Sequence, residues 1–202
     1  MFRKLAPTSL MFTLLCLCSV NAIRADTVTF TGTRTNQTPP ANPIGRCSAL
    51  GEFTVNINPR PGTSDFSIGT SNFGNFTSIQ SHCITPPLPA PFNNGEFTWT
   101  FANGNTLIGT YFGALTGTFI PGATNVLNDT EIYTVTGGTG LFTGATGNIL
   151  GTGTVTFFPD RFPLSNATLN GTINTTPEPT TLALLGTGLI AVALKGRKRR
   201  SC

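Results

Sequence analysis

Residues 133–148 read YTVTGGTGLFTGATGN, and this stretch decides the fold class. An alternating run from Tyr133 to Val135 enters it, and a second extended run leaves from Asn148. The five glycines between them permit tight turns with positive φ, and the pair Leu141-Phe142 supplies an apolar plug. The stretch therefore predicts two strands joined by a glycine-rich turn. A phosphate-binding loop is excluded, because neither a helix nor a lysine follows the glycines.

Short alternating runs recur on both sides of this stretch. In each run apolar and hydroxyl side chains alternate, as in a strand with one buried face. Turn signals such as Asn58-Pro59 and Pro121-Gly122 separate the runs. The runs lie at 27–30, 53–57, 97–101, 131–135, 152–157 and 167–173. The sequence therefore predicts an all-β domain, either a single antiparallel β-barrel or a β-sandwich.

The glycine pattern also resembles a known signature. It runs from Val135 through Gly140 and continues with Phe142, Gly144 and Gly147. In this form it is similar to the signature of the allene oxide cyclase and dirigent barrel-like superfamily, where it links two late strands of a barrel. The resemblance spans residues 96–173 and implies about eight strands. That superfamily takes its polar cavity residues from early strands, and no early-strand motif matches here, so no catalytic residue is carried over.

The N-terminus has the layout of a secretory signal peptide. Charged residues Arg3 and Lys4 precede an apolar run at 10–20, and the small residues Ala22 and Ala25 follow it. A run of roughly 11 residues is too short for a bilayer core, which needs about 20. We therefore expect residues 1–25 to be removed on export, and the all-β domain to occupy residues 26–176.

The C-terminus, residues 177–202, has three parts in strict order. A proline-flanked acid comes first, and an apolar stretch at 181–194 predicts a short membrane helix. A basic cluster then stops translocation on the cytoplasmic side. The acid and its flanks are Pro177, Glu178 and Pro179, and the basic cluster is Lys195, Arg197, Lys198, Arg199 and Arg200.

This ordered triple resembles the PEP-CTERM sorting signal of Gram-negative bacteria, which an exosortase recognises. The resemblance implies an exosortase as partner, transient anchoring in the inner membrane, and delivery to the cell surface or the extracellular space. An ordinary single-pass tail anchor is the alternative. A glycolipid-anchor signal fits less well, because it normally ends in its apolar segment.

The basic residues and the cysteines are distributed differently between the two terminal segments and the all-β segment at 26–176. Eight of the 12 basic residues lie in the two terminal segments, so the segment 26–176 is mildly acidic and a nucleic-acid partner is excluded. Two cysteines, Cys47 and Cys83, remain in that segment. In an exported protein they predict one disulfide, with two unpaired thiols as the alternative.

The all-β segment shows little sign of chemistry. His82 adjoins Cys83, and neighbours on a strand point to opposite faces, so we expect a disulfide-bonded Cys83 and a surface His82. Asp129 and Glu131 are expected to cap a turn with Asn128, with contact to a cation as the alternative, and Trp99 is expected to fill the barrel. No metal-ligand spacing occurs, and no cofactor is expected. The sequence thus predicts a non-enzymatic surface or matrix protein associated with exopolysaccharide. A barrel that binds a small apolar ligand and a cyclase-like isomerase are the alternatives.

Overall fold

The computed structural model of the chain describes residues 26–58 and 66–175, together with Gly186 and Gly188. The expected signal peptide, the sorting residues Pro177–Pro179, the membrane helix at 181–194 (those two glycines apart) and the basic cluster lie outside the described residues. In the part that is described, no helix has the length and apolar character needed to cross a membrane.

The described chain is all-β, as the alternating runs predicted. It forms nine strands and two short 3-10 helices, and the paired strands are antiparallel. The strands are β1 (Asp26–Gln37), β2 (Phe53–Ile57), β3 (Ser67–Ser71), β4 (Gly74–Ile84), β5 (Pro91–Phe101), β6 (Thr106–Thr116), β7 (Asn125–Gly138), β8 (Thr146–Phe157) and β9 (Leu164–Thr175); the helices are η1 (Ser48–Leu50) and η2 (Gly140–Phe142).

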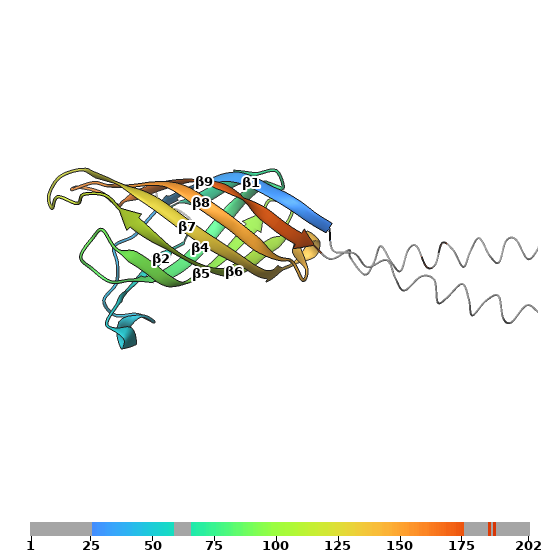
Figure 1. The fold of residues 1–202 in the computed structure, drawn as a ribbon, viewed down its shortest axis with the longest axis horizontal. Coiled ribbons are helices and arrows are strands. Elements are labelled where there is room, and N and C mark those ends of the chain that lie inside the picture. The colour runs from blue at the N-terminus through green and yellow to red at the C-terminus, as the bar shows by residue number, and fades with distance from the viewer. Residues whose placement is uncertain (1–25, 59–65, 176–185, 187, 189–202) are drawn as a thin grey trace, which may run out of the picture.

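The sheet closes into a barrel, which decides between the two predicted architectures (Figure 1). Eight strands form the ring in the order β1-β3-β4-β5-β6-β7-β8-β9, and β9 pairs back onto β1. The ninth strand, β2, lies end to end with β3 along the same edge of β4. β3 pairs with residues 74–77 of β4, and β2 pairs with residues 80–84.

Three strands of the ring, β3, β4 and β6, lie outside the predicted alternating runs. For β4 the inward residues explain why, because Phe76 is followed at alternate positions by Ser78, Gln80 and His82, all of them buried. A strand whose buried face is half polar shows no apolar alternation, so a periodicity rule passes over it.

The glycine-rich turn forms as expected at one end of the barrel. Gly140 and Gly144 adopt φ of 57° and 66°, a region that favours glycine. Between them Phe142 is buried and packs against Phe73 and Phe101, with ring centroids 5.3 and 5.0 Å away. Leu141 is 43% exposed, so only Phe142 acts as the predicted plug.

Aromatic rings fill this end of the barrel. Trp99 is fully buried, as predicted, and its ring lies 5.0 Å from Phe76 and 5.5 Å from Phe30. The first and last strands begin and end here, because Asp26 pairs with Thr175 (Figure 1). We call this the plugged end; the opposite end is the mouth.

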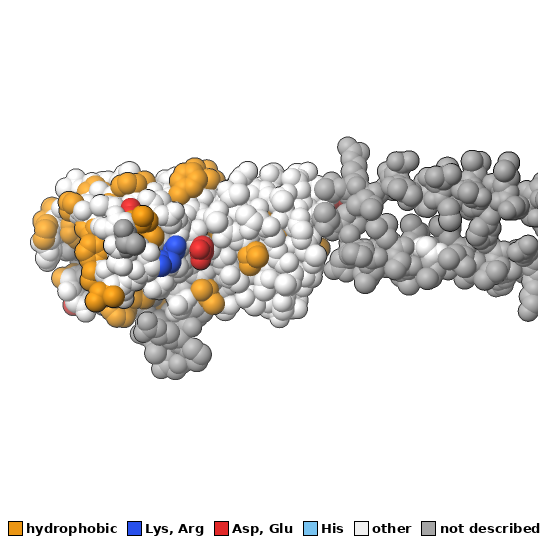
Figure 2. Space-filling view, turned by 90° about the horizontal axis from the view of Figure 1, so that it is seen from below, with side chains coloured by type: hydrophobic (Ala, Val, Ile, Leu, Met, Phe, Trp, Pro, Cys, Tyr) orange, Lys and Arg blue, Asp and Glu red, His pale blue; other side chains and the backbone are white. Residues whose placement is uncertain are grey.

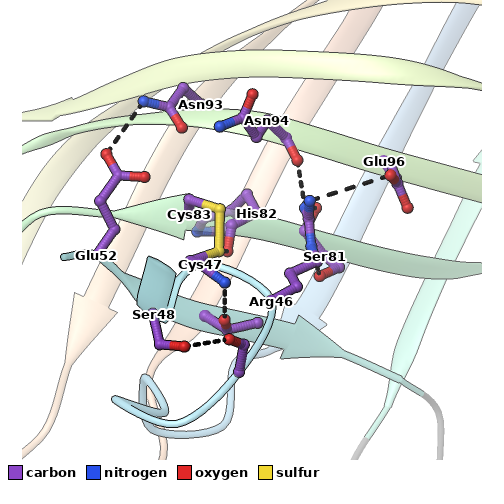
Figure 3. The surroundings of a disulfide bond; sticks show 12 residues. Arg46, Cys47, Ser48, Glu52, Ser81, His82, Cys83, Asn93, Asn94 and Glu96 are labelled. Atoms are coloured by element: carbon purple, nitrogen blue, oxygen red, sulfur yellow. Dashed lines mark hydrogen bonds and ion pairs between the residues drawn. A yellow bond between two sulfur atoms is a disulfide. The ribbon is translucent and has the colours of Figure 1, made fainter. Parts of the chain in front are cut away.

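The predicted disulfide between Cys47 and Cys83 is present, with the two Cα atoms 5.6 Å apart. Cys83 points outward from β4, and the segment 38–52 crosses the outside of the barrel to meet it (Figure 3). Arg46 fastens the same segment by donating to the hydroxyl and the carbonyl of Ser81, at 3.0 and 2.9 Å, and to the carbonyl of Asn94.

The plug gives the first testable prediction. Phe142→Ala removes a buried ring and should lower the free energy of unfolding by roughly 3–5 kcal/mol. Leu141→Ala, its exposed neighbour in the same turn, should change it by less than about 0.5 kcal/mol. Chemical denaturation of both variants checks this, and equal losses would show that Phe142 does not close the barrel.

Candidate functional site

The mouth of the barrel opens into a cavity of about 580 Å³. Outside the floor described next, the lining is apolar apart from Thr38 and Arg161. Figure 2 shows hydrophobic side chains gathered at this end of the face in view, with scattered ones farther along the wall. This volume falls in the range of small-molecule sites in proteins. The apolar lining consists of Pro39, Pro40, Ala41, Phe53, Val55, Ile57, Ile84, Pro86, Leu88, Phe92, Leu115, Val155, Phe157, Phe162 and Pro163.

The cavity ends on a layer of buried polar side chains, which we call the polar floor: Arg34, His82, Asp129, Glu131 and Ser165. Two of them correct the sequence analysis. Asp129 and Glu131 do not cap a turn but lie in the middle of β7, with inward side chains that are 4% and 5% exposed.

Arg34 forms the centre of the floor. It comes from β1, is 2% exposed, and faces Glu131 in a two-pronged pair: Nη1 lies 2.9 Å from Oε2 and Nη2 donates to Oε1 at 3.1 Å. Nη2 also donates to Ser165 Oγ at 3.3 Å. Burial alone lowers the pKa of Arg34, but Glu131 and its neighbours outweigh it and raise the pKa, so the guanidinium stays charged.

Tyr133 completes this ion pair from below. Its hydroxyl donates to Glu131 Oε2 at 2.8 Å and accepts from Arg34 Nη1 and from Gln80 Nε2, the latter at 2.7 Å. Burial raises the pKa of Tyr133 well above its ordinary value, so the hydroxyl keeps its proton. Every hydrogen-bonding site of this hydroxyl is therefore in use.

Asp129 is only partly satisfied. Ser165 donates to its Oδ2 at 3.4 Å, while Oδ1 has no hydrogen-bond partner among the described residues. Burial, and then the negative charge of Glu131, raise the pKa of Asp129 to about 8, although Arg34 and Ser165 act in the opposite direction. One cation thus faces two carboxyl groups, and the second of these keeps its proton at neutral pH.

His82 is the other correction. It was expected on the surface, yet its side chain points into the barrel, where Nδ1 lies 2.7 Å from the Tyr111 hydroxyl and the ring lies 4.6 Å from that of Phe92. The opposite-face rule itself is confirmed, because Cys83 takes the outer face. Burial, followed by the charges of Arg34 and Arg46, lowers the pKa of His82 to about 3, so the ring is neutral.

The floor residues were missed because the runs were searched for apolar side chains. The signal that identifies them is their spacing along the strand. Asp129 and Glu131 lie an even number of residues from the inward-facing Tyr133 on β7, and Arg34 lies an even number of residues from the inward-facing Phe30 on β1. Side chains two residues apart on a strand share a face, so each of them must enter the barrel.

The fold and the cavity together define a closed antiparallel barrel with room for a small molecule at one end. The chain also matches the PEP-CTERM protein-sorting motif over residues 175–200. The expected sorting signal is therefore present, and it implies an exported protein that an exosortase sorts.

No curated protein matches the chain. Among solved structures, a pterocarpan synthase dirigent protein aligns with it at 10% sequence identity and a TM-score of 0.26, over 86% of this chain and 99% of that chain.

Asp129 makes stability depend on pH. Because its pKa rises from 3.8 to about 8 in the folded protein, the folded state binds more protons than the unfolded chain between these values, and stability falls as pH rises. His82, with a pKa lowered from 6.5 to about 3, destabilises the fold only as pH drops below 6.5.

Thermal unfolding between pH 6.5 and 8.5 should therefore show a declining stability that Asp129→Asn abolishes. The parent should lose on the order of 1–2 kcal/mol of stability across this range, since each pH unit between the two pKa values is worth about 1.4 kcal/mol, and the variant should not. Asp160→Asn, at an exposed loop position, serves as the control and should follow the parent. Parallel curves for all three proteins would contradict the raised pKa of Asp129.

Proposed function

We propose that this protein is a non-enzymatic component of the cell surface or extracellular matrix, delivered there through its C-terminal signal and associated with exopolysaccharide. The sorting motif at 175–200 is the observation that carries the proposal. The described barrel wall supports it, because outward positions on β1 and β9 hold threonine and asparagine side chains that bond to each other. Thr35 donates to Asn166 at 3.0 Å, for example.

In this proposal the two terminal segments act in sequence. Residues 1–25 direct export and are removed. Residues 181–194 then hold the chain in the inner membrane for a short time, with the basic cluster at 195–200 on the cytoplasmic side. An exosortase cleaves beside Pro177-Glu178-Pro179, and the all-β domain, residues 26–176, is released to the surface or the medium.

The mass and C-terminus of the protein from its native host test this sequence of events. The product should begin near Asp26 and end near Pro177. Glu178→Gln should leave full-length tails in the membrane fraction, whereas Glu96→Gln, an exposed glutamate on β5, should be processed normally. A mature protein that retains Leu182–Cys202 would make the tail a permanent anchor.

Binding of a small apolar ligand is the second candidate function. The specific observation that favours it is the cavity of about 580 Å³, whose apolar walls stand over the polar floor. Within the polar floor Arg34 and Glu131 satisfy each other with the help of Tyr133 below and Ser165 beside them. This leaves Asp129 and His82 as the floor groups that could meet a ligand. The uncharged state of both suits a neutral, mostly apolar molecule with one polar group.

The cyclase-like isomerase is a variant of this candidate. A buried carboxyl group with a raised pKa beside a cavity is a recognised mark of acid–base sites, and Asp129 has this character. Recovery of a bound ligand separates the two cases. A binding protein returns the ligand unchanged, whereas an isomerase returns a rearranged product and loses this activity in Asp129→Asn.

The fluorescent apolar amine N-phenyl-1-naphthylamine tests the cavity directly. It should bind the processed protein, and Val155→Phe, which fills part of the lining, should weaken binding about tenfold, equivalent to roughly 1.4 kcal/mol. Val126→Phe is the matched control, because Val126 is 59% exposed and lies on the outside of the neighbouring strand. Equal binding by both variants would place the probe outside the cavity.

A further inference from the structure

The outer wall of the barrel over β7, β8 and β9 is almost free of charge. From residue 126 to 174 its outward positions on these strands are threonine or asparagine, apart from Gly138 and four apolar exceptions, and none of these described positions is ionisable. The apolar exceptions are Val126, Ile132, Leu150 and the half-buried Leu164.

Two of the exceptions belong to one row. Phe112 on β6 lies directly opposite Ile132 on β7, and Ile132 lies directly opposite Leu150 on β8. All three side chains are outside the barrel and are 51%, 37% and 45% exposed. We call these three residues the apolar row. It crosses three neighbouring strands at right angles, at the inter-strand spacing of about 4.8 Å.

Hydrogen-bonding side chains flank the apolar row. The next outward positions toward the plugged end, two residues along each strand, hold Thr110, Thr134 and Asn148. These residues pair across the same three strands. The next outward positions toward the mouth hold Ala114, Thr130 and Thr152, which pair across the same three strands. Side chains two residues apart on a strand are about 6.7 Å apart, so hydroxyl and amide groups border the row on both sides, except beside Phe112 on the mouth side.

The Phe112 end of the row opens into a groove of about 450 Å³ on the outside of the barrel. Arg46, Glu96 and Thr110 line it, and Arg46 Nη1 lies 4.0 Å from Glu96 Oε1. Figure 3 shows how the disulfide-linked segment brings Arg46 to this place, between β4 and β5. Because the one cation is paired with the one carboxylate, the groove adds polar groups without net charge.

We propose that the apolar row and its flanking hydroxyls bind a neutral polysaccharide chain laid across β6, β7 and β8, with one end in the Arg46–Glu96 groove. A pyranose ring has an apolar face of C–H groups and a rim of hydroxyls. The row meets the face and the threonines meet the rim. This inference rests on the proposed matrix association and assigns it a location.

Two other occupants fit the wall less well. A second copy of the chain would need about 800 Å² of contact per partner, with some 20–30 residues, and three isolated apolar side chains provide only a small part of that. A flat crystalline surface would need a flat sheet, whereas the wall of a closed eight-stranded barrel curves and twists. A single flexible chain can follow that curvature.

The test uses the processed protein from its host and native gels that contain hydroxyethyl cellulose, dextran, alginate or the host's own matrix polysaccharide. Migration should be retarded by a neutral polysaccharide. The double variant Ile132→Thr/Leu150→Thr continues the threonine pattern of the wall. Its retardation should be at least fivefold smaller than that of the parent. Ile68→Thr is the matched control, because Ile68 is 52% exposed on β3, away from the row.

Each result has a definite meaning. Retardation that the double variant loses and Ile68→Thr keeps supports the row. Retardation equal in all three proteins overturns the row but leaves matrix association standing, and preferential binding of alginate overturns the neutral class of ligand. Self-association of the parent that the double variant loses assigns the row to a second copy instead. No retardation by any of the four polymers overturns both proposals.

Discussion

The buried pair of Arg34 and Glu131 sets the organisation of the barrel interior. A buried cation is costly unless it is paired and hydrogen-bonded, so Arg34 on β1 requires Glu131 on β7. Tyr133 and Ser165 hydrogen-bond to this pair, and Gln80 in turn donates to the Tyr133 hydroxyl. This polar layer divides the interior into two parts. Below it aromatic rings fill the space, and above it the cavity stays open to the mouth.

The outer segment from residue 38 to 52 holds β2 in place where β2 and β3 meet along one edge of β4. β2 shares one edge of β4 with β3, and among the described strands it pairs with β4 alone. The disulfide fixes one side of the segment to β4, and a single bridge between Asn42 and Thr54 joins its start to β2. The same segment brings Arg46 to the outer groove and Pro39–Ala41 to the cavity.

The sequence predicted the class of fold, the glycine-rich turn, the disulfide and the sorting signal, because each depends on local residue types. It did not predict β4, since Ser78, Gln80 and His82 occupy buried positions where apolar residues are expected. It misplaced Asp129, Glu131 and His82 for the same reason. Acids are usually exposed and histidines are intermediate in burial, and their burial here depends on a partner from another strand, which is Arg34 for the acids and Tyr111 for His82. The sequence does not show which distant residue becomes that partner, because only the closed barrel brings the two strands together.

Asp26 and Thr175 pair at the plugged end, so the chain enters and leaves the barrel at one pole while the cavity opens at the other. Any attachment beyond Thr175 therefore holds the barrel by its plugged end. The mouth with its apolar lining then points away from the attachment, and the hydroxyl-rich outer wall over β7, β8 and β9 lies along the side. In this orientation the two proposed binding surfaces, the cavity at the mouth and the apolar row on the outer wall, would not compete for space.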